Sequence, residues 1–145
     1  MLYYIDYTAI FPSIDEEISR VAASEYSDAG ESLYDAITLH SNDAEEIRRL
    51  EDDAVNTLVK RNYDIVTIVP NNNLGIPALQ FNVPDLDTST ECIIRDEIRR
   101  FIVLNVCAAW FQARARGKVE EFALRGQAAL DKASTMLHTR KAPTR

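Results

Sequence analysis

The sequence predicts a mainly α-helical protein, built as one domain of four helices with an inserted β-hairpin. Four stretches place apolar residues three or four positions apart, which is the spacing of one helical face. A shorter stretch near the middle instead holds β-branched and alternating apolar residues bounded by prolines, which is typical of strands. With 145 residues, 46% of them hydrophobic, the chain is long enough for a single core.

Residues 1–12 are expected to form an N-terminal segment ahead of the first helix. Tyr3, Tyr4 and Tyr7 crowd this segment. Tyrosine combines apolar area with a polar hydroxyl and is favoured at interfaces, so the three are candidate contact residues. The alternative is that the segment folds back on the core of its own chain.

The first helix is predicted over 13–27, directly after a proline. Ser13 and Glu16 have the spacing of a capping box, which marks a helix start. Residues 31–40 fit a strand about as well as a short helical turn, and we expect an extended or irregular segment there. A second helix is predicted over 43–62, with one apolar stripe and an opposite face of charged residues.

The β-hairpin is predicted over 65–84, with strands at 65–69 and 78–83. The residues between them, PNNNLGIP, contain three asparagines, a glycine and a proline at each end, which is turn chemistry. A two-stranded hairpin is marginal alone, so it must pack on the helices or be completed by another chain. Asn72 and Asn73 are candidate contact residues, and the alternative is a plain hairpin tip.

A central core helix is predicted over 88–116. The stretch lacks glycine and proline and is apolar on both faces in its second half, which is typical of a helix buried on all sides. The last helix, 118–138, should run antiparallel to it, with Gly126 permitting a close approach that offsets its low helix propensity. The predicted core residues of this pair are Ile98, Phe101, Ile102, Trp110, Phe111, Phe122 and Leu130.

The residue inventory does not predict an enzyme. Cys92 and Cys107 would lie about 22 Å apart on one helix, so they cannot form a disulfide, and we expect buried free thiols. His40 and His138 have no ligand or catalytic partner nearby in sequence, and no glycine-rich phosphate loop is present. We therefore expect no cofactor, no metal site, no membrane span and no signal peptide, and hence a cytoplasmic protein.

The net charge of −7 is unevenly distributed along the chain. The first 60 residues carry −10 and the remainder carries +3, which suggests head-to-tail contact between copies; the alternative is a solvated face on each half. An acidic total disfavours binding to duplex nucleic acid. Residues 139–145 are expected to form a flexible basic tail, in which Arg140, Lys141 and Arg145 are candidate contact residues.

Three stretches carry a resemblance: the opening IDYTAIFPSIDEEI, the central DEIRRFIVLNVCAAWFQARA and the closing EEFALRGQAALDKASTMLHTRKAPTR. Together they resemble the small head–tail connector (adaptor or head-completion) proteins of tailed phages and prophages. The resemblance implies a connector-like four-helix domain that serves as a structural protein of the virion neck and is made in the bacterial cytoplasm. It also implies a homo-oligomeric ring, a dodecamer where it docks beneath the portal, with portal and tail or stopper proteins as partners and no cofactor.

Two other interpretations stay open. The chain is also compatible with a soluble helical module that binds or regulates one partner protein and, as a weaker third interpretation, with a tail-completion protein. The mass of the purified protein separates a ring from a module.

Overall fold

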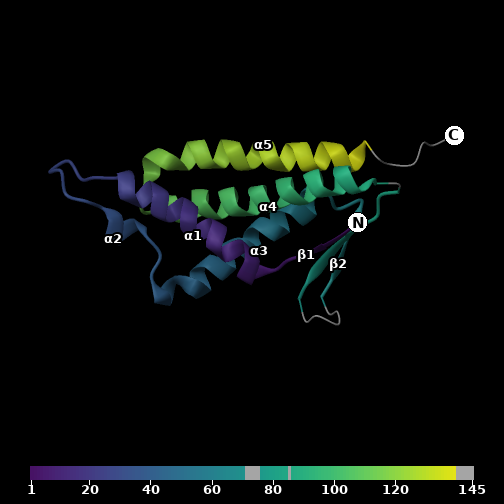
Figure 1. The fold of residues 1–145 in the computed structure, drawn as a ribbon, viewed down its shortest axis with the longest axis horizontal. Helices are drawn as coiled ribbons and strands as arrows, with labels where there is room; N and C mark the ends of the chain where they lie inside the picture. Colours follow the sequence, from purple (N-terminus) through teal and green to yellow (C-terminus); the bar gives the residue numbers. More distant parts are fainter. Residues whose placement is uncertain (71–75, 85, 140–145) are drawn as a thin grey trace.

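The computed structural model describes residues 1–70, 76–84 and 86–139. The predicted fold class is confirmed, since four long helices and a small antiparallel sheet account for most of this part of the chain (Figure 1). In chain order the elements are β1 (Leu2–Tyr4), α1 (Tyr7–Ser24), α2 (Tyr34–Ile37), the 3₁₀ turn η1 (Ser41–Asp43), α3 (Ala44–Arg61), β2 (Val66–Val69), β3 (Ala78–Phe81), α4 (Thr88–Phe111), the 3₁₀ turn η2 (Arg116–Lys118) and α5 (Val119–His138).

Helix α4 is the centre of the molecule, and α5 lies antiparallel along it while α1 and α3 pack against its other sides (Figure 1). Its second half is buried almost all the way round, as predicted from its apolar sequence. The rings of Phe111 and Phe122 meet edge to face across the α4–α5 turn, with centroids 5.0 Å apart. All seven residues predicted for the core are buried: Ile98, Phe101, Ile102, Trp110, Phe111, Phe122 and Leu130.

Gly126 marks the closest approach of the two helices. A Cβ atom placed on it would lie 3.4 Å from the Leu104 Cβ and 3.5 Å from the Asn105 backbone nitrogen. A methyl group would make ordinary contacts there and a larger side chain would not fit, so the packing requires a small residue at this position.

Helix α1 begins six residues earlier than predicted, so residues 1–12 are not one segment ahead of the helix. The Asp6 carboxylate accepts hydrogen bonds from the Thr8 and Ala9 backbone N–H groups, at 3.1 and 3.3 Å, and this cap starts the helix at Tyr7. Pro12 therefore lies inside α1 rather than before it. The predicted capping box at Ser13 was wrong because an aspartate upstream provides the cap, and a single proline did not end the helix.

The sheet has three strands rather than two, because β1 pairs with β3 in the order β1-β3-β2. Both pairings are antiparallel, with Tyr3 opposite Leu79 and Ile68 also opposite Leu79 on the other side. The predicted β-hairpin is thus completed by the start of its own chain, not by another copy. A three-residue strand is too short for a periodicity argument to detect.

Three smaller expectations also need correction. The central helix ends at Phe111 rather than 116, and the chain then turns through η2. Its N-terminus is capped by Asp87, whose carboxylate accepts from the Thr90 N–H at 2.7 Å. Cys92 is exposed, while Cys107 is buried and its thiol pKa is raised to about 12 by desolvation. The irregular stretch 31–40 contains the short helix α2.

Candidate protein-interaction surfaces

The tyrosines predicted as contact residues lie in three different environments. Tyr3 is buried within its own chain, and desolvation raises its pKa to about 12. Tyr4 is 38% exposed at the end of β1. Tyr7 is partly buried, and its hydroxyl donates a hydrogen bond to the Asp52 carboxylate on α3. The other predicted contact residues, Asn72, Asn73, Arg140, Lys141 and Arg145, lie outside the described residues.

A groove of about 420 Å³ runs between the first turns of α1 and the first turns of α3. The Arg48 guanidinium stacks on the Tyr7 ring at 3.4 Å and forms one wall. Phe11, which is 37% exposed, and Pro12 form the apolar opposite wall. Glu51 closes the groove from the α3 side.

Glu51 is the most unusual acid in this groove, because only 2% of it is exposed and its Oε2 atom has no hydrogen-bond partner. Desolvation raises the pKa of its carboxyl to about 7, and the nearby Arg48 only partly opposes this. The group therefore takes up a proton near neutral pH. The Glu51 carboxyl is the one acid among the residues that line the groove, which otherwise include the Tyr7 and Thr8 hydroxyls and the Arg48 guanidinium.

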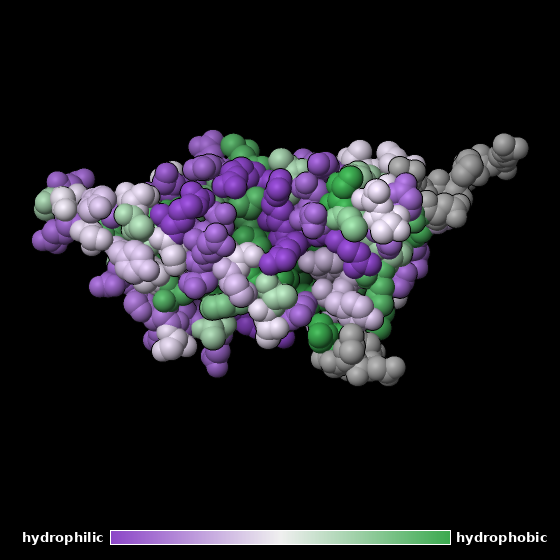
Figure 2. Space-filling view, in the orientation of Figure 1, coloured by the Kyte–Doolittle hydropathy of each residue, from purple (hydrophilic) through white to green (hydrophobic). Residues whose placement is uncertain are grey.

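The acidic arm, defined as residues 25–35, projects from one end of the bundle between α1 and α2 (Figures 1 and 2). It carries Glu25, Asp28, Glu31 and Asp35 and no lysine or arginine. No ion pair involves any of these four acids in the part of the chain that the structure describes. Tyr26 and Tyr34 are 60% and 41% exposed. The arm therefore displays negative charge together with aromatic surface.

The arm is ordered by its own backbone rather than by the core. Ser27 N–H donates to the Glu31 carbonyl at 2.7 Å, and Leu33 N–H donates to the Glu25 carbonyl at 3.0 Å. Gly30 turns the chain at a φ of 80°, a conformation that glycine adopts without steric cost. The arm is thus a small closed loop, presented in a defined shape.

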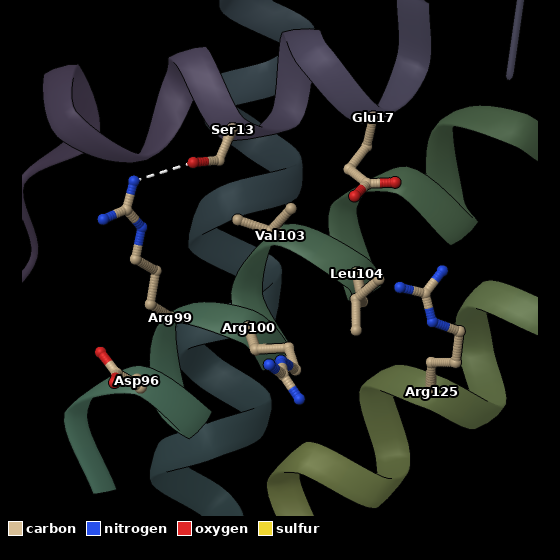
Figure 3. Close-up of a pocket in the computed structure, with 8 residues that line it drawn as sticks. All are labelled: Ser13, Glu17, Asp96, Arg99, Arg100, Val103, Leu104 and Arg125. Carbon is tan, nitrogen blue, oxygen red and sulfur yellow. Dashed lines mark hydrogen bonds between the residues drawn. The ribbon is translucent and has the colours of Figure 1, made fainter. Parts of the chain in front are cut away.

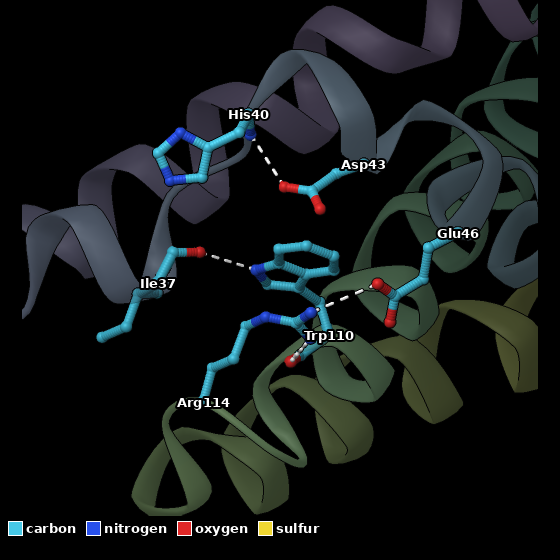
Figure 4. A network of polar contacts seen from close by, with 6 residues as sticks. All are labelled: Ile37, His40, Asp43, Glu46, Trp110 and Arg114. Carbon is cyan, nitrogen blue, oxygen red and sulfur yellow. Dashed lines mark hydrogen bonds and ion pairs between the residues drawn. The ribbon is translucent and has the colours of Figure 1, made fainter.

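A polar network around Trp110 fixes the base of the arm to α4 (Figure 4). The Trp110 indole N–H donates to the Ile37 carbonyl at 2.7 Å, and Ile37 itself is fully buried. The Arg114 guanidinium lies 3.4 Å over the indole ring and pairs with Glu46 at 3.2 Å. Because these groups tie α2, α3 and α4 together, the arm projects from a rigid base.

A second concave surface, the arginine pocket, opens between α1, α4 and α5 with a volume of about 410 Å³ (Figure 3). Val103 and Leu104 form its floor. The residues that line it are Ser13, Glu17, Asp96, Arg99, Arg100, Val103, Leu104 and Arg125. Lys132 extends the positive charge along the neighbouring groove between α4 and α5.

The three arginines of this pocket are paired to different extents. Arg99 donates to the Ala9 carbonyl and to the Ser13 hydroxyl, at 3.1 and 2.8 Å, and so joins α4 to α1. Arg100 and Arg125 make only long ion pairs of 3.9 Å, each with a glutamate on its own helix. The side chains of Arg100 and Arg125 are 65% and 46% exposed, so both can reach a group that enters from solvent.

Sequence reasoning missed both the arm and the pocket as surfaces. A signal for the arm was present, since no lysine or arginine occurs between Arg20 and Arg48 while two tyrosines do. The pocket had no such signal, because Arg100 and Arg125 come from different helices and meet only after α4 and α5 pack.

The described residues hold no group of three or more side chains suited to bind a metal ion. Over the same residues, none of the helices combines the length and the apolar character that crossing a bilayer requires. No protein-family model matches the chain, and neither a curated protein nor a solved structure matches it at a significant level.

Proposed function

We propose that this chain is a structural virion protein, a ring-forming head–tail connector (adaptor) subunit that joins the portal to the tail. The observation that carries the proposal is that one small domain displays an acidic, tyrosine-bearing arm and a separate concave surface rich in arginine. Complementary charge at two different places on one molecule favours association between copies in a head-to-tail manner. The resemblance of three stretches to the connector family supports the same conclusion.

Head-to-tail contacts are heterologous, and they close into a ring when the rotation between neighbours divides a full turn. Each exposed ion pair contributes only about 0–1 kcal/mol, but many such contacts repeat around a ring. An isolated copy is then weakly associating, while copies collected on a portal assemble. The ring is a dodecamer if it matches the portal beneath which it docks.

The proposed role is mechanical and not catalytic, and it needs no cofactor. Portal and tail or stopper proteins are the partners, at the neck of the virion, after synthesis in the host cytoplasm. A net charge of −7 suits a channel through which DNA passes without being held. Sequence-specific binding to nucleic acid is not part of this function.

Two measurements test the proposal. Native mass spectrometry over rising concentration should reveal multiples of the subunit that lead to a closed ring. Addition to portal-bearing heads that lack this protein should restore tail attachment, as counted by electron microscopy. Heads that gain tails equally well without the protein would contradict the connector role, and a single one-to-one complex with an unrelated protein would favour a binding module.

The contact residues predicted from sequence supply a second set of variants. Replacing Asn71–Asn73 with a shorter turn should leave the melting temperature unchanged and reduce tail attachment. Deleting 139–145, which removes Arg140, Lys141 and Arg145, should have the same pattern of effects. Full attachment by both variants would restrict the interface to other surfaces.

A further inference from the structure

We infer that the acidic arm of one copy inserts its tip into the arginine pocket of the next copy. This inference rests on the proposed function, and it names the two surfaces that make the junction between neighbours in the ring. The partner is thus a second copy of this chain, bound through carboxylate–guanidinium pairs and a tyrosine.

The tip of the arm offers the chemistry that a guanidinium binds. Asp28 and Glu31 stand on either side of the Gly30 turn, both are exposed, and neither has an ion pair in the described residues. Tyr26 faces solvent beside them, with 60% of its surface exposed. Because the loop is closed by its own backbone hydrogen bonds, little further ordering is needed when it binds.

The pocket offers the matching groups. Among the described residues, the ion pairs of Arg100 and Arg125 are long, at 3.9 Å each, and a planar guanidinium binds a carboxylate through two parallel hydrogen bonds. The apolar floor of Val103 and Leu104 provides a dry surface beneath these charges. Arg125 already lies 5.2 Å over the Phe122 ring, which shows that this side chain stacks on aromatic rings, as it would on Tyr26.

The acids inside the pocket do not cancel its positive charge. The residues that line the pocket include three arginines and two acids, Glu17 and Asp96, so their net charge is +1. Glu17 also pairs with Arg20 on its own helix, and Arg100 and Arg125 pair with Glu97 and Glu121 at 3.9 Å. An incoming carboxylate therefore meets a net positive site on a protein whose total charge is negative.

The arm of the same copy does not fill this pocket. Its base is fixed by the Trp110–Ile37 hydrogen bond, and its loop projects past one end of the layer formed by α4 and α5 (Figure 1). The pocket opens on the flank of that layer (Figure 3). An end that binds a flank makes a heterologous contact, which is the geometry that a ring requires.

The test uses charge reversal with matched controls on the full-length chain. The arm variant is Asp28→Lys with Glu31→Lys, and the pocket variant is Arg100→Glu with Arg125→Glu. Each should weaken self-association by at least about a hundredfold in sedimentation velocity, because like charges then face each other. Circular dichroism and melting temperature verify that each variant is folded, and Arg100→Gln with Arg125→Gln replaces the pocket variant if it is not.

The controls change the net charge by the same amount as the variants, at exposed positions outside the arm and the pocket. Glu16→Lys with Asp53→Lys matches the arm variant, and Arg49→Glu with Lys60→Glu matches the pocket variant. Both controls should associate within about threefold of the unaltered protein at one salt concentration, since they alter net charge but not the junction. Equal weakening by the controls would mean that only net charge matters, which would overturn the inference.

The decisive experiment combines the two sets of reversals in one chain. A chain with Asp28→Lys, Glu31→Lys, Arg100→Glu and Arg125→Glu has the original net charge and complementary surfaces again, so association should return. A mixture of the separate arm and pocket variants should also associate, although neither does so alone. The reversed arm of the first variant meets the reversed pocket of the second, and the native arm of the second meets the native pocket of the first, so the two variants should alternate around the ring.

The outcomes separate this inference from the proposed function. Rings or portal docking that survive both reversals would overturn the arm–pocket junction and leave the connector role standing. An arm–pocket junction that yields open chains or dimers, with no effect on tail attachment, would overturn the connector role instead. An unaltered protein that stays monomeric at millimolar concentration, even on portal-bearing heads, would overturn both.

Discussion

In the α4–α5 hairpin, the second half of α4 is buried on almost every side, whereas in the acidic arm nearly all side chains face solvent. The hairpin is held by apolar packing, including the close contact at Gly126, and the arm is held by its own backbone hydrogen bonds. The difference indicates that stability and surface contacts are provided by separate regions of one small domain. Changes in the hairpin should alter stability, and changes in the arm should alter only what the surface contacts.

The largest effect is expected at Trp110, where the two regions meet. Trp110→Ala should lower the free energy of unfolding by about 3–5 kcal/mol, because it removes a buried ring and leaves the Ile37 carbonyl without its donor. Trp110→Phe keeps most of the packing and should cost about 1–3 kcal/mol. Urea denaturation measures both variants. A near-neutral Trp110→Ala would mean that Trp110 does not anchor the base of the arm to the core.

A buried acid should make stability depend on pH. The Glu51 carboxyl has its pKa raised to about 7 in the folded chain, above its unfolded value, because the charged form is desolvated. The stabilisation is fully present below the unfolded pKa and is lost as pH rises toward about 7.

Glu51→Gln should therefore raise the free energy of unfolding by about 2–3 kcal/mol at pH 8 and change it little at pH 4. Asp53→Asn, an exposed neighbour on the same helix, is the control and should show neither effect. Denaturant melts across this pH range measure both variants. A Glu51→Gln effect that is the same at both pH values would mean that the carboxyl does not change its protonation on folding.

The contact at Gly126 should distinguish close packing from simple helix propensity. Gly126→Leu should destabilise by about 1–3 kcal/mol, since the added atoms meet Leu104 and the α4 backbone. Gly126→Ala adds a methyl group at ordinary contact distance and gains helix propensity, so its net effect should stay within about 1 kcal/mol. Thermal melts suffice, and an equally stable Gly126→Leu variant would mean that the two helices can move apart.

The smallest effect is expected in the arm. Tyr26→Ala should change the free energy of unfolding by no more than about 0.5 kcal/mol, because the side chain is 60% exposed and contributes little to the core. The same variant should weaken self-association. A loss of stability above about 1 kcal/mol would make the arm part of the core and remove the contrast with the hairpin.

The sequence predicted the α4–α5 helical hairpin well because the patterns that indicate it lie within each helix. An uninterrupted apolar stretch in α4 and a glycine on the inner face of α5 are enough to place two packed helices and their core residues. We predicted the wrong start for α1. Proline is typical of helix starts, so Pro12 outweighed Asp6 in that prediction. Propensity rules evaluate each candidate cap residue by itself, whereas the packing of the whole chain determines which of them starts the helix.

The candidate surfaces were much harder to predict. The arm is a short loop whose shape depends on backbone hydrogen bonds, and the arginine pocket needs three helices in place before it exists. Cys92 was expected to be buried because it lies on the central helix, but only one face of the first turns of α4 is covered, the face of Thr90 and Ile94, and Cys92 lies on the other. Surface features made by several elements have no periodicity in the sequence.

The order of strands in the sheet also sets an order of events during synthesis. Strand β1 can pair only with β3, and α1, the arm and α3 are all made between the two. The β2–β3 ladder is local and closes a short loop, but the β1–β3 ladder closes a long one at a larger entropic cost. As the chain emerges from the ribosome, Leu2–Tyr4 therefore stays unpaired until Ala78–Phe81 has followed it. A segment translated before α1, the arm and α3 therefore reaches its native place only after all of them have been made.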